Sequence, residues 1–245
     1  INPPRIRLSE EFVRPMRLDK YISNATDLSR SQAKRAIKHS LVTIDERIIR
    51  DPALKVAANQ TVAIEGATIR HAENRYFMLN KPAGVVSVSK DKLHTTALQL
   101  VYEHRAEALQ IAGRLDIDST GLLLITDDGA WNHRLTSPRS NCAKLYRVGL
   151  MNAIGADYPA LLADGVQLEG EKHRCLPATM QQIDSHHLSL QIAEGKYHQV
   201  KRMFAALGNH VVSLHRTQIG TIRLDPELEP GDYRPLTCAE VASIQ

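Results

Sequence analysis

Residues 113–124, with the sequence GRLDIDSTGLLL, constrain the fold of this chain more than any other stretch. The first nine of them hold two glycines, one Arg, two Asp, one Ser and one Thr, and the apolar run 122–125 follows directly. Glycines and short polar side chains at this density are typical of a tight turn. A short apolar run next to turn residues is typical of a buried strand. The stretch therefore predicts a polar turn that leads into a strand of the core.

This turn supports two interpretations. It can be a solvated turn before a core strand, which is the common case for turns with two aspartates. It can also be catalytic, because a carboxylate such as Asp116 stays ionised beside the guanidinium of Arg114 and, near apolar walls, can act as a nucleophile or a base. From the residues alone, Asp118 is an equal candidate for that role.

Charge is distributed unevenly along the 245 residues, which carry a net charge of +4. Residues 1–66 hold 12 Lys/Arg and 8 Asp/Glu, so the whole excess lies there and the rest of the chain is balanced. The length is sufficient for a small and a large domain. A small basic module joined to a neutral body predicts a polyanion-binding appendage on a separate catalytic or structural unit.

Several classes of protein lack support in the sequence. No apolar stretch is long enough to cross a bilayer, and three widely spaced cysteines argue against a disulfide framework or a cysteine-based zinc site. We find no phosphate-binding loop, no dinucleotide-binding glycine motif, no zinc-protease helix and no serine nucleophile elbow. We therefore expect a cytoplasmic protein that does not contact membranes and uses no metal and no cofactor.

The basic module shows clear local signals. After a flexible extension at 1–15, we expect a short helix at 16–22 and a second helix from Ser29 to about His39, which Ser29 and Gln32 start as a capping box. Short strands are expected at 41–44 and 61–64, and a polar linker at 67–74. Four cations form a stripe on the second helix. This basic stripe consists of Arg30, Lys34, Arg35 and Lys38. Such a stripe is often only a solvated face, but its density here favours contact with phosphates.

The body at 75–245 predicts an α+β domain with many short, mainly antiparallel strands. Strands are expected at 76–79, 85–88, 122–125, 144–150, 188–192, 211–214 and 219–224. A turn is expected at 80–84. Helices are expected at 98–109, 131–135, 156–163 and 200–207, with a last helix capped by Thr237 and Glu240. A second dense polar cluster lies at 194–204, where the sequence is EGKYHQVKRMF.

The basic module resembles a known RNA-binding domain. The segments RLDK (17–20), SRSQAK (29–34) and LVTID (41–45) are similar to those of the S4-type RNA-binding domain, over about residues 16–64. The resemblance implies a small α/β RNA-binding domain, which we place at 16–66.

The body resembles the pseudouridine synthases of the RsuA type, and with the basic module the likeness covers about residues 16–240. Four segments carry it, in the family's order: NKPAG (80–84), GRLD with GL (113–116, 121–122), KLY (144–146) and EGKYHQVKRM (194–203). Three more favour the branch that acts on small-subunit ribosomal RNA, namely TSPR (136–139), YHQ (197–199) and GNH (208–210). The resemblance implies a mixed, mainly antiparallel sheet, and a cofactor-free reaction that turns a uridine in RNA into pseudouridine.

The resemblance also assigns roles to residues. It implies that Asp116 is the catalytic carboxylate, either as nucleophile at C1′ or as a base, and that Lys201 pairs with it, with Arg202 as second choice. Tyr146 would pack against the target base, although a strand tyrosine is more often a core residue. We assign RNA contact to Arg114, Arg202 and the basic stripe.

We therefore expect a monomer that binds small-subunit ribosomal RNA, or an assembly intermediate of it, and isomerises one uridine. Three alternatives remain open. The chain could act on large-subunit ribosomal RNA, it could be a non-catalytic ribosomal RNA-binding assembly factor, or it could be an RNA glycosylase that leaves an abasic site.

Overall fold

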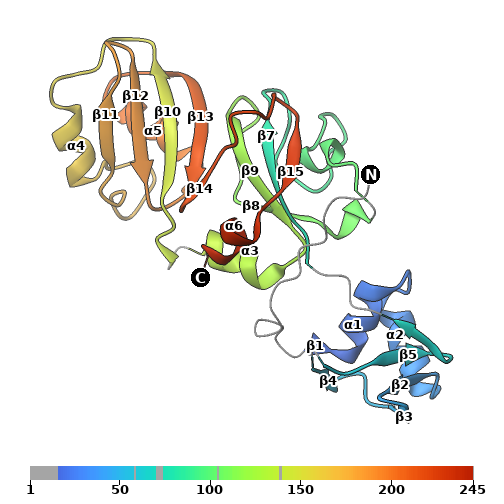
Figure 1. Ribbon diagram of the computed structural model, residues 1–245. Coiled ribbons are helices and arrows are strands. Elements are labelled where there is room, and N and C mark those ends of the chain that lie inside the picture. The colour runs from blue at the N-terminus through green and yellow to red at the C-terminus, as the bar shows by residue number, and fades with distance from the viewer. Residues whose placement is uncertain (1–15, 58, 70–73, 104, 138–139, 245) are drawn as a thin grey trace. The chain divides into compact units, whose positions relative to one another are not determined.

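The computed structural model describes residues 16–57, 59–69, 74–103, 105–137 and 140–244 (Figure 1). The extension expected at 1–15 lies outside the described residues. The chain forms two compact units, Ile1–Glu73 and Asn74–Gln245, and each is described here by itself.

The smaller unit packs two helices on a sheet. Helices α1 (Leu18–Ala25) and α2 (Arg30–Lys38) lie against a four-stranded antiparallel sheet with the order β3-β2-β5-β6. Its strands are β2 (Val42–Ile44), β3 (Arg47–Ile48), β5 (Val62–Ile64) and β6 (Ala67–Ile69), and a separate pair joins β1 (Met16–Arg17) to β4 (Lys55–Val56). The Ser29 side chain accepts from the amide of Gln32, whose side chain accepts from the amide of Ser29, so the expected capping box is confirmed.

The sheet of the smaller unit extends further along the chain than we expected. Residues 67–69 pair with β5 as strand β6, whereas the sequence analysis placed them in the linker at 67–74. Their alternation is too short and too exposed to be recognised without the neighbouring strand, which supplies the hydrogen bonds.

The larger unit is built on a nine-stranded sheet. Seven strands follow in the order β11-β12-β10-β13-β9-β7-β15, with β14 on β13 and β8 on β9. The bounds are β7 (Tyr76–Lys81), β8 (Gln110–Ala112), β9 (Thr120–Thr126), β10 (Lys144–Leu150), β11 (Thr179–Gln182), β12 (His187–Ile192), β13 (Val211–Ile219), β14 (Ile222–Arg223) and β15 (Tyr233–Pro235). Among these pairs β13 and β9 run parallel and the others antiparallel, which confirms the predicted α+β class.

The contact between β13 and β9 is a short seam in this sheet. It joins the β11-β12-β10-β13 half to the β9-β7-β15 half (Figure 1) through two residue pairs, His215 with Thr120 and Arg216 with Gly121. Gly121 has a φ of +96°, and a Cβ atom there would lie 2.9 Å from the amide nitrogen of Arg216 and still closer to its carbonyl oxygen. A glycine is therefore needed where the two halves meet.

Strand β9 is buried on both faces, which explains its continuous apolar run. Leu123 and Ile125 belong to a core that includes α4 (Tyr158–Asp164) and α5 (Gln199–Ala206). Leu122 and Leu124 face a second core under α3 (Gly129–Thr136) and α6 (Cys238–Ala242). Figure 1 shows α3 and α6 side by side, and the indole of Trp131 on α3 donates to the carbonyl of Val241 on α6 at 3.0 Å.

Five of the expected elements differ in the structure. The helix at 98–109 is wrong: two 3-10 turns, η2 (Ala97–Leu100) and η3 (Ala106–Ala108), take its place, and Arg105 between them has a left-handed φ of 54°. Residues 85–88 hold only an isolated bridge at Val86. The strands expected at 211–214 and 219–224 form the single strand β13 followed by β14, and β7 runs through 80–81, where we expected a turn.

Candidate active site

The turn before β9 is held from beneath by a buried lysine. Lys81 has no exposed surface, and its ammonium donates to the carbonyls of Ser119 (2.7 Å), Pro82 (2.8 Å) and Ile117 (3.4 Å). The amide of Gly84 also donates to the Ile117 carbonyl. These bonds fix the backbone of the segment that carries Asp116 and Asp118.

Lys81 should make stability depend on pH. Burial lowers the pKa of Lys81 to about 8, against the opposing effect of the carboxylates of Asp118 and Asp116. Between pH 8 and 10 the unfolded chain therefore holds a proton that the folded protein has released, and stability due to this residue rises with pH. We expect the unfolding free energy of the wild type, relative to Lys81→Met, to rise by about 2 kcal/mol over this range. Urea titrations at both pH values measure it, and a difference that is independent of pH would contradict it.

Two basic side chains, Lys201 and His198, reach Asp116 from the start of α5. The Lys201 ammonium and His198 Nε2 each lie 3.4 Å from its carboxylate oxygens, and 27% of the Asp116 side chain is exposed. The structure thus brings together the predicted pair, Asp116 and Lys201, although the two lie 85 positions apart in the sequence.

Asp118 is the nearer partner of Lys201. Its carboxylate lies 2.6 Å from the ammonium, but 66% of its side chain is exposed, so it points into solvent. The hydrogen bond from Lys201 lowers the pKa of Asp118. Burial disfavours the charge of Lys201, but the carboxylates of Asp118 and Asp116 outweigh it and raise the pKa of the ammonium. Lys201 therefore stays protonated between two carboxylates.

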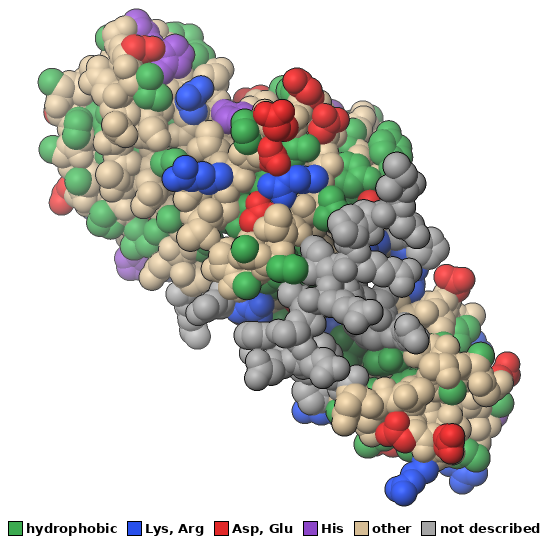
Figure 2. Space-filling view, viewed as in Figure 1, with side chains coloured by type: hydrophobic (Ala, Val, Ile, Leu, Met, Phe, Trp, Pro, Cys, Tyr) green, Lys and Arg blue, Asp and Glu red, His purple; other side chains and the backbone are tan. Residues whose placement is uncertain are grey.

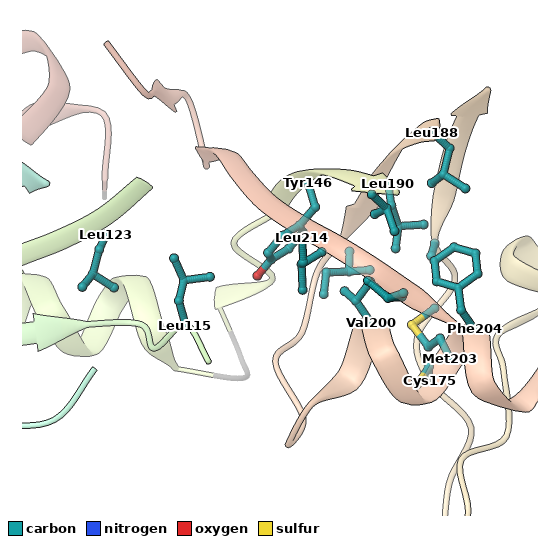
Figure 3. Packing of buried hydrophobic residues seen from close by; sticks show 14 of the residues in the cluster. Leu115, Leu123, Tyr146, Cys175, Leu188, Leu190, Val200, Met203, Phe204 and Leu214 are labelled. Carbon is teal, nitrogen blue, oxygen red and sulfur yellow. The ribbon is translucent and has the colours of Figure 1, made fainter. Parts of the chain in front are cut away.

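Tyr146 lies on β10 opposite Arg216 of β13 and is 7% exposed. Figure 3 shows its phenol oxygen directed toward Leu115, which precedes Asp116, and away from Phe204 and Met203. The hydroxyl lies 3.4 Å from the guanidinium of Arg216. Tyr146 is thus a core residue whose polar end faces the loop that carries the carboxylate.

Arg216 is a site residue that the sequence analysis missed. It is 2% exposed, and its guanidinium donates to the carbonyls of Leu122 (2.8 Å), Arg114 (3.1 Å) and Gly113 (3.2 Å). Among the described residues it has no carboxylate partner within ion-pair distance. Burial of a cation costs free energy unless hydrogen bonds compensate it. In Arg216 the backbone carbonyls of the loop provide these hydrogen bonds, and the same bonds hold the loop in place. An arginine among the apolar positions of a strand was the available signal.

Two other predicted residues lie differently. The side chain of Arg114 is exposed, and its backbone carbonyl accepts a hydrogen bond from the guanidinium of Arg216. The guanidinium of Arg202 donates to Glu171 (3.0 Å) and to the carbonyls of Tyr197 (3.1 Å) and Glu169 (2.6 Å). The structure therefore brings Lys201, and not Arg202, to Asp116.

In the smaller unit, part of the basic stripe has an internal partner. Asp19 has no exposed surface and lies 3.0 Å from Arg17, 3.3 Å from Arg30 and 3.9 Å from Lys34. These neighbours, chiefly the hydrogen bond from Arg17, lower the pKa of Asp19 to about 2. About half of each of the Arg30 and Lys34 side chains remains exposed. The stripe is therefore held on its inner edge by Asp19, and its outer edge faces solvent.

The part of the chain that the structure describes contains no group of three or more His, Cys, Asp or Glu side chains arranged for a metal ion. In the same residues, no helix has the length and apolar character required to cross a bilayer. On the face of the larger unit shown in Figure 2, acidic and basic side chains are interspersed.

Comparison with known proteins assigns both units to families. The model of the RNA pseudouridylate synthase family matches residues 75–206, which include Asp116, Tyr146 and Lys201. The chain belongs to the RNA pseudouridylate synthase family. The S4 domain model matches residues 16–62, so this pseudouridylate synthase carries an S4 domain at its N-terminal side, as the resemblance implied.

The similarity extends over nearly the whole chain. The pseudouridylate synthase is 50% identical over 230 residues to "Ribosomal small subunit pseudouridine synthase A" of Escherichia coli strain K12, covering 94% of this chain and 100% of that relative. The relative of the same name from Yersinia pestis is 48% identical, with 94% and 98% covered. A solved structure, "Crystal structure of pseudouridylate synthase", has a TM-score of 0.69 at 44% identity and covers 94% of this chain and 100% of that chain.

Proposed function

We propose that this chain isomerises one uridine of small-subunit ribosomal RNA to pseudouridine. The family provides the reaction, and relatives that are about half identical over their full length are named for the small ribosomal subunit. The observation that carries the proposal for the site is the half-buried Asp116 carboxylate between Lys201 and His198.

We assign the chemistry to three side chains. Asp116 acts on the ribose of the target nucleotide, as nucleophile at C1′ or as base, and Lys201 keeps its carboxylate ionised. The N1–C1′ bond breaks, the uracil turns, the C5–C1′ bond forms, and the C5 proton leaves while N1 gains one. Tyr146 packs against the base, with its hydroxyl available for the proton at C5. The base must leave its stack for this chemistry, and an aromatic face such as that of Tyr146 helps to hold it.

The products distinguish this function from its alternatives. RNA carrying tritium at C5 of uridine releases it on isomerisation, and the mass of the RNA stays unchanged. A glycosylase would release free uracil, and a non-catalytic assembly factor would release neither. Mapping pseudouridine in ribosomal RNA from cells with and without this protein then separates a small-subunit from a large-subunit target. Absence of tritium release would refute the catalytic assignment.

We assign RNA docking to the smaller unit, in which the outer edge of the basic stripe contacts phosphates. We place the two domains at 16–66 and 75–245, and we propose that the protein acts as a monomer. Phosphate contacts position an RNA without reading its bases. Arg35 and Lys38 of the stripe have no ion-pair partner among the described residues, so their charge is available for this contact.

Removal of charge from the stripe should weaken binding in a salt-dependent manner. Lys38→Gln, alone and with Lys34→Gln, is expected to lower RNA affinity and to reduce the slope of log K against log salt by about one for each lost phosphate contact. Filter binding between low and physiological salt measures both values. Lys55→Gln changes an exposed lysine outside the stripe and serves as the control. Equal slopes for all variants would contradict the docking role.

A further inference from the structure

Two aromatic side chains form an exposed stack directly before α5. The rings of Tyr197 and His198 lie 3.8 Å apart at an interplanar angle of 21°, and 74% of Tyr197 is exposed. Only one face of the tyrosine ring is used by the histidine. An exposed tyrosine held in this way offers its other face to a planar ligand.

The stack is fixed beside the carboxylate of the site. His198 Nε2 lies 3.4 Å from Asp116, so the inner ring of the stack contacts the proposed catalytic group. His198 also has a left-handed φ of 47°, a conformation that is costly for a residue other than glycine and that concentrates at functional sites.

The loop that presents the stack is held rigidly by Gln199, which is 5% exposed. Its side chain donates to Glu194 at 2.8 Å and accepts from the amide of Lys196 at 2.8 Å. Glu194 in turn accepts from the amide of Leu176 on a separate loop.

The backbone of Tyr197 is held from the other side, because its carbonyl accepts from the guanidinium of Arg202 at 3.1 Å. This contact gives Arg202 a positioning role. The exposed ring is therefore preorganised, so little conformational entropy remains to be lost when a ligand stacks on it.

We propose that the free face of Tyr197 binds the nucleobase next to the target uridine, and this inference rests on the proposed function. A uridine that leaves its stack exposes one face of each neighbouring base. A base stacked on the tyrosine would replace the lost contact, and through His198 it would hold the RNA in register with Asp116. Stacking is tolerant of base identity, so this contact adds affinity and register but little sequence preference.

The test combines protein variants with abasic RNA. The probe is a synthetic RNA oligonucleotide that spans the uridine found by mapping, in its normal form and with an abasic nucleotide at either flanking position. Dissociation constants are measured in the Asp116→Asn background, which prevents turnover. Tyr197→Ala is expected to weaken binding of the normal RNA about tenfold or more. With the nucleotide that stacks on Tyr197 made abasic, the same substitution should have no effect.

Further variants separate stacking from other roles. Tyr197→Phe and Tyr197→Trp keep a ring face and should bind the normal RNA within about twofold of the tyrosine, since stacking needs the ring and not the hydroxyl. Tyr102→Ala removes another exposed tyrosine of the same unit, 85% exposed, and is expected to leave binding unchanged. Far-ultraviolet circular dichroism verifies that each variant is folded.

Other outcomes would overturn the inference. A Tyr197→Ala loss that is equal on normal and abasic RNA would mean that the ring supports the loop and binds no base. If Tyr197→Ala in the otherwise wild-type protein lowers kcat while the affinity measured in the Asp116→Asn background is unchanged, the ring only positions His198. If the wild type releases tritium and either of these results is found, the base-stacking role of Tyr197 is rejected but the proposed function stands. If no ribosomal RNA releases tritium, both the stacking role and the proposed function are rejected.

Discussion

Asp116→Asn is expected to abolish pseudouridine formation, with a loss of at least about 10³-fold in kcat/KM, because an amide can act neither as nucleophile nor as base. The substitution is isosteric, and the buried bonds of Lys81 and Arg216 to the loop involve backbone carbonyls. RNA affinity and folding should therefore remain close to those of the wild type. Tritium release under single-turnover conditions, with filter binding on the same RNA, separates the two effects.

Asp118→Asn is the matched comparison, because the residues alone could not rank the two carboxylates. Asp118 is the nearer to Lys201 but the more exposed, and an exposed ion pair contributes about 0–1 kcal/mol, or a factor of up to about five. We expect a loss within that factor. If Asp118→Asn abolishes turnover and Asp116→Asn does not, the catalytic roles of the two residues must be exchanged.

The parts of the fold that depend on residues close together in the sequence could be predicted from the sequence. The turn and strand at 113–124, the capping boxes at Ser29 and Thr237, and the strand at 144–150 all appear in the structure. Each depends on short-range geometry, such as a side chain that caps the amide three residues later. The pairing of Asp116 with Lys201 has no such local signal, and only the resemblance to a family indicated it.

Buried charges were the part of the site that the sequence could not provide. Lys81, Arg216 and Asp19 all lie inside the protein, whereas a charged residue in a sequence is normally expected at the surface. Each is satisfied by groups that become neighbours only in the fold. Arg216, for example, binds the carbonyl of Gly113, 103 positions away. Long-range contacts also explain why β13 runs without interruption through the polar residues 215–218, where the sequence suggested a break between two strands.

Gly121→Ala is expected to destabilise the larger unit by about 3 kcal/mol or more, because the new methyl group would collide with the backbone of Arg216 at a positive φ. Urea titration followed by the fluorescence of Trp131 measures this loss. Trp131 is the single tryptophan of the chain, and it is buried against the same half of the sheet. The control is Gly129→Ala at the first position of α3, where a Cβ has open space and alanine is a better helix former than glycine.

The seam also connects this substitution to function. Arg216 forms the seam with its backbone and holds the loop of Asp116 with its side chain. A shift of β13 away from β9 therefore moves the guanidinium, the hydroxyl of Tyr146 and the carboxylate relative to one another. We expect Gly121→Ala to lose most of its turnover even at temperatures where fluorescence reports a folded protein, since misplacement of reacting groups by about 1 Å can cost a factor of about 10². Full turnover by the folded variant would show that the seam supports stability alone.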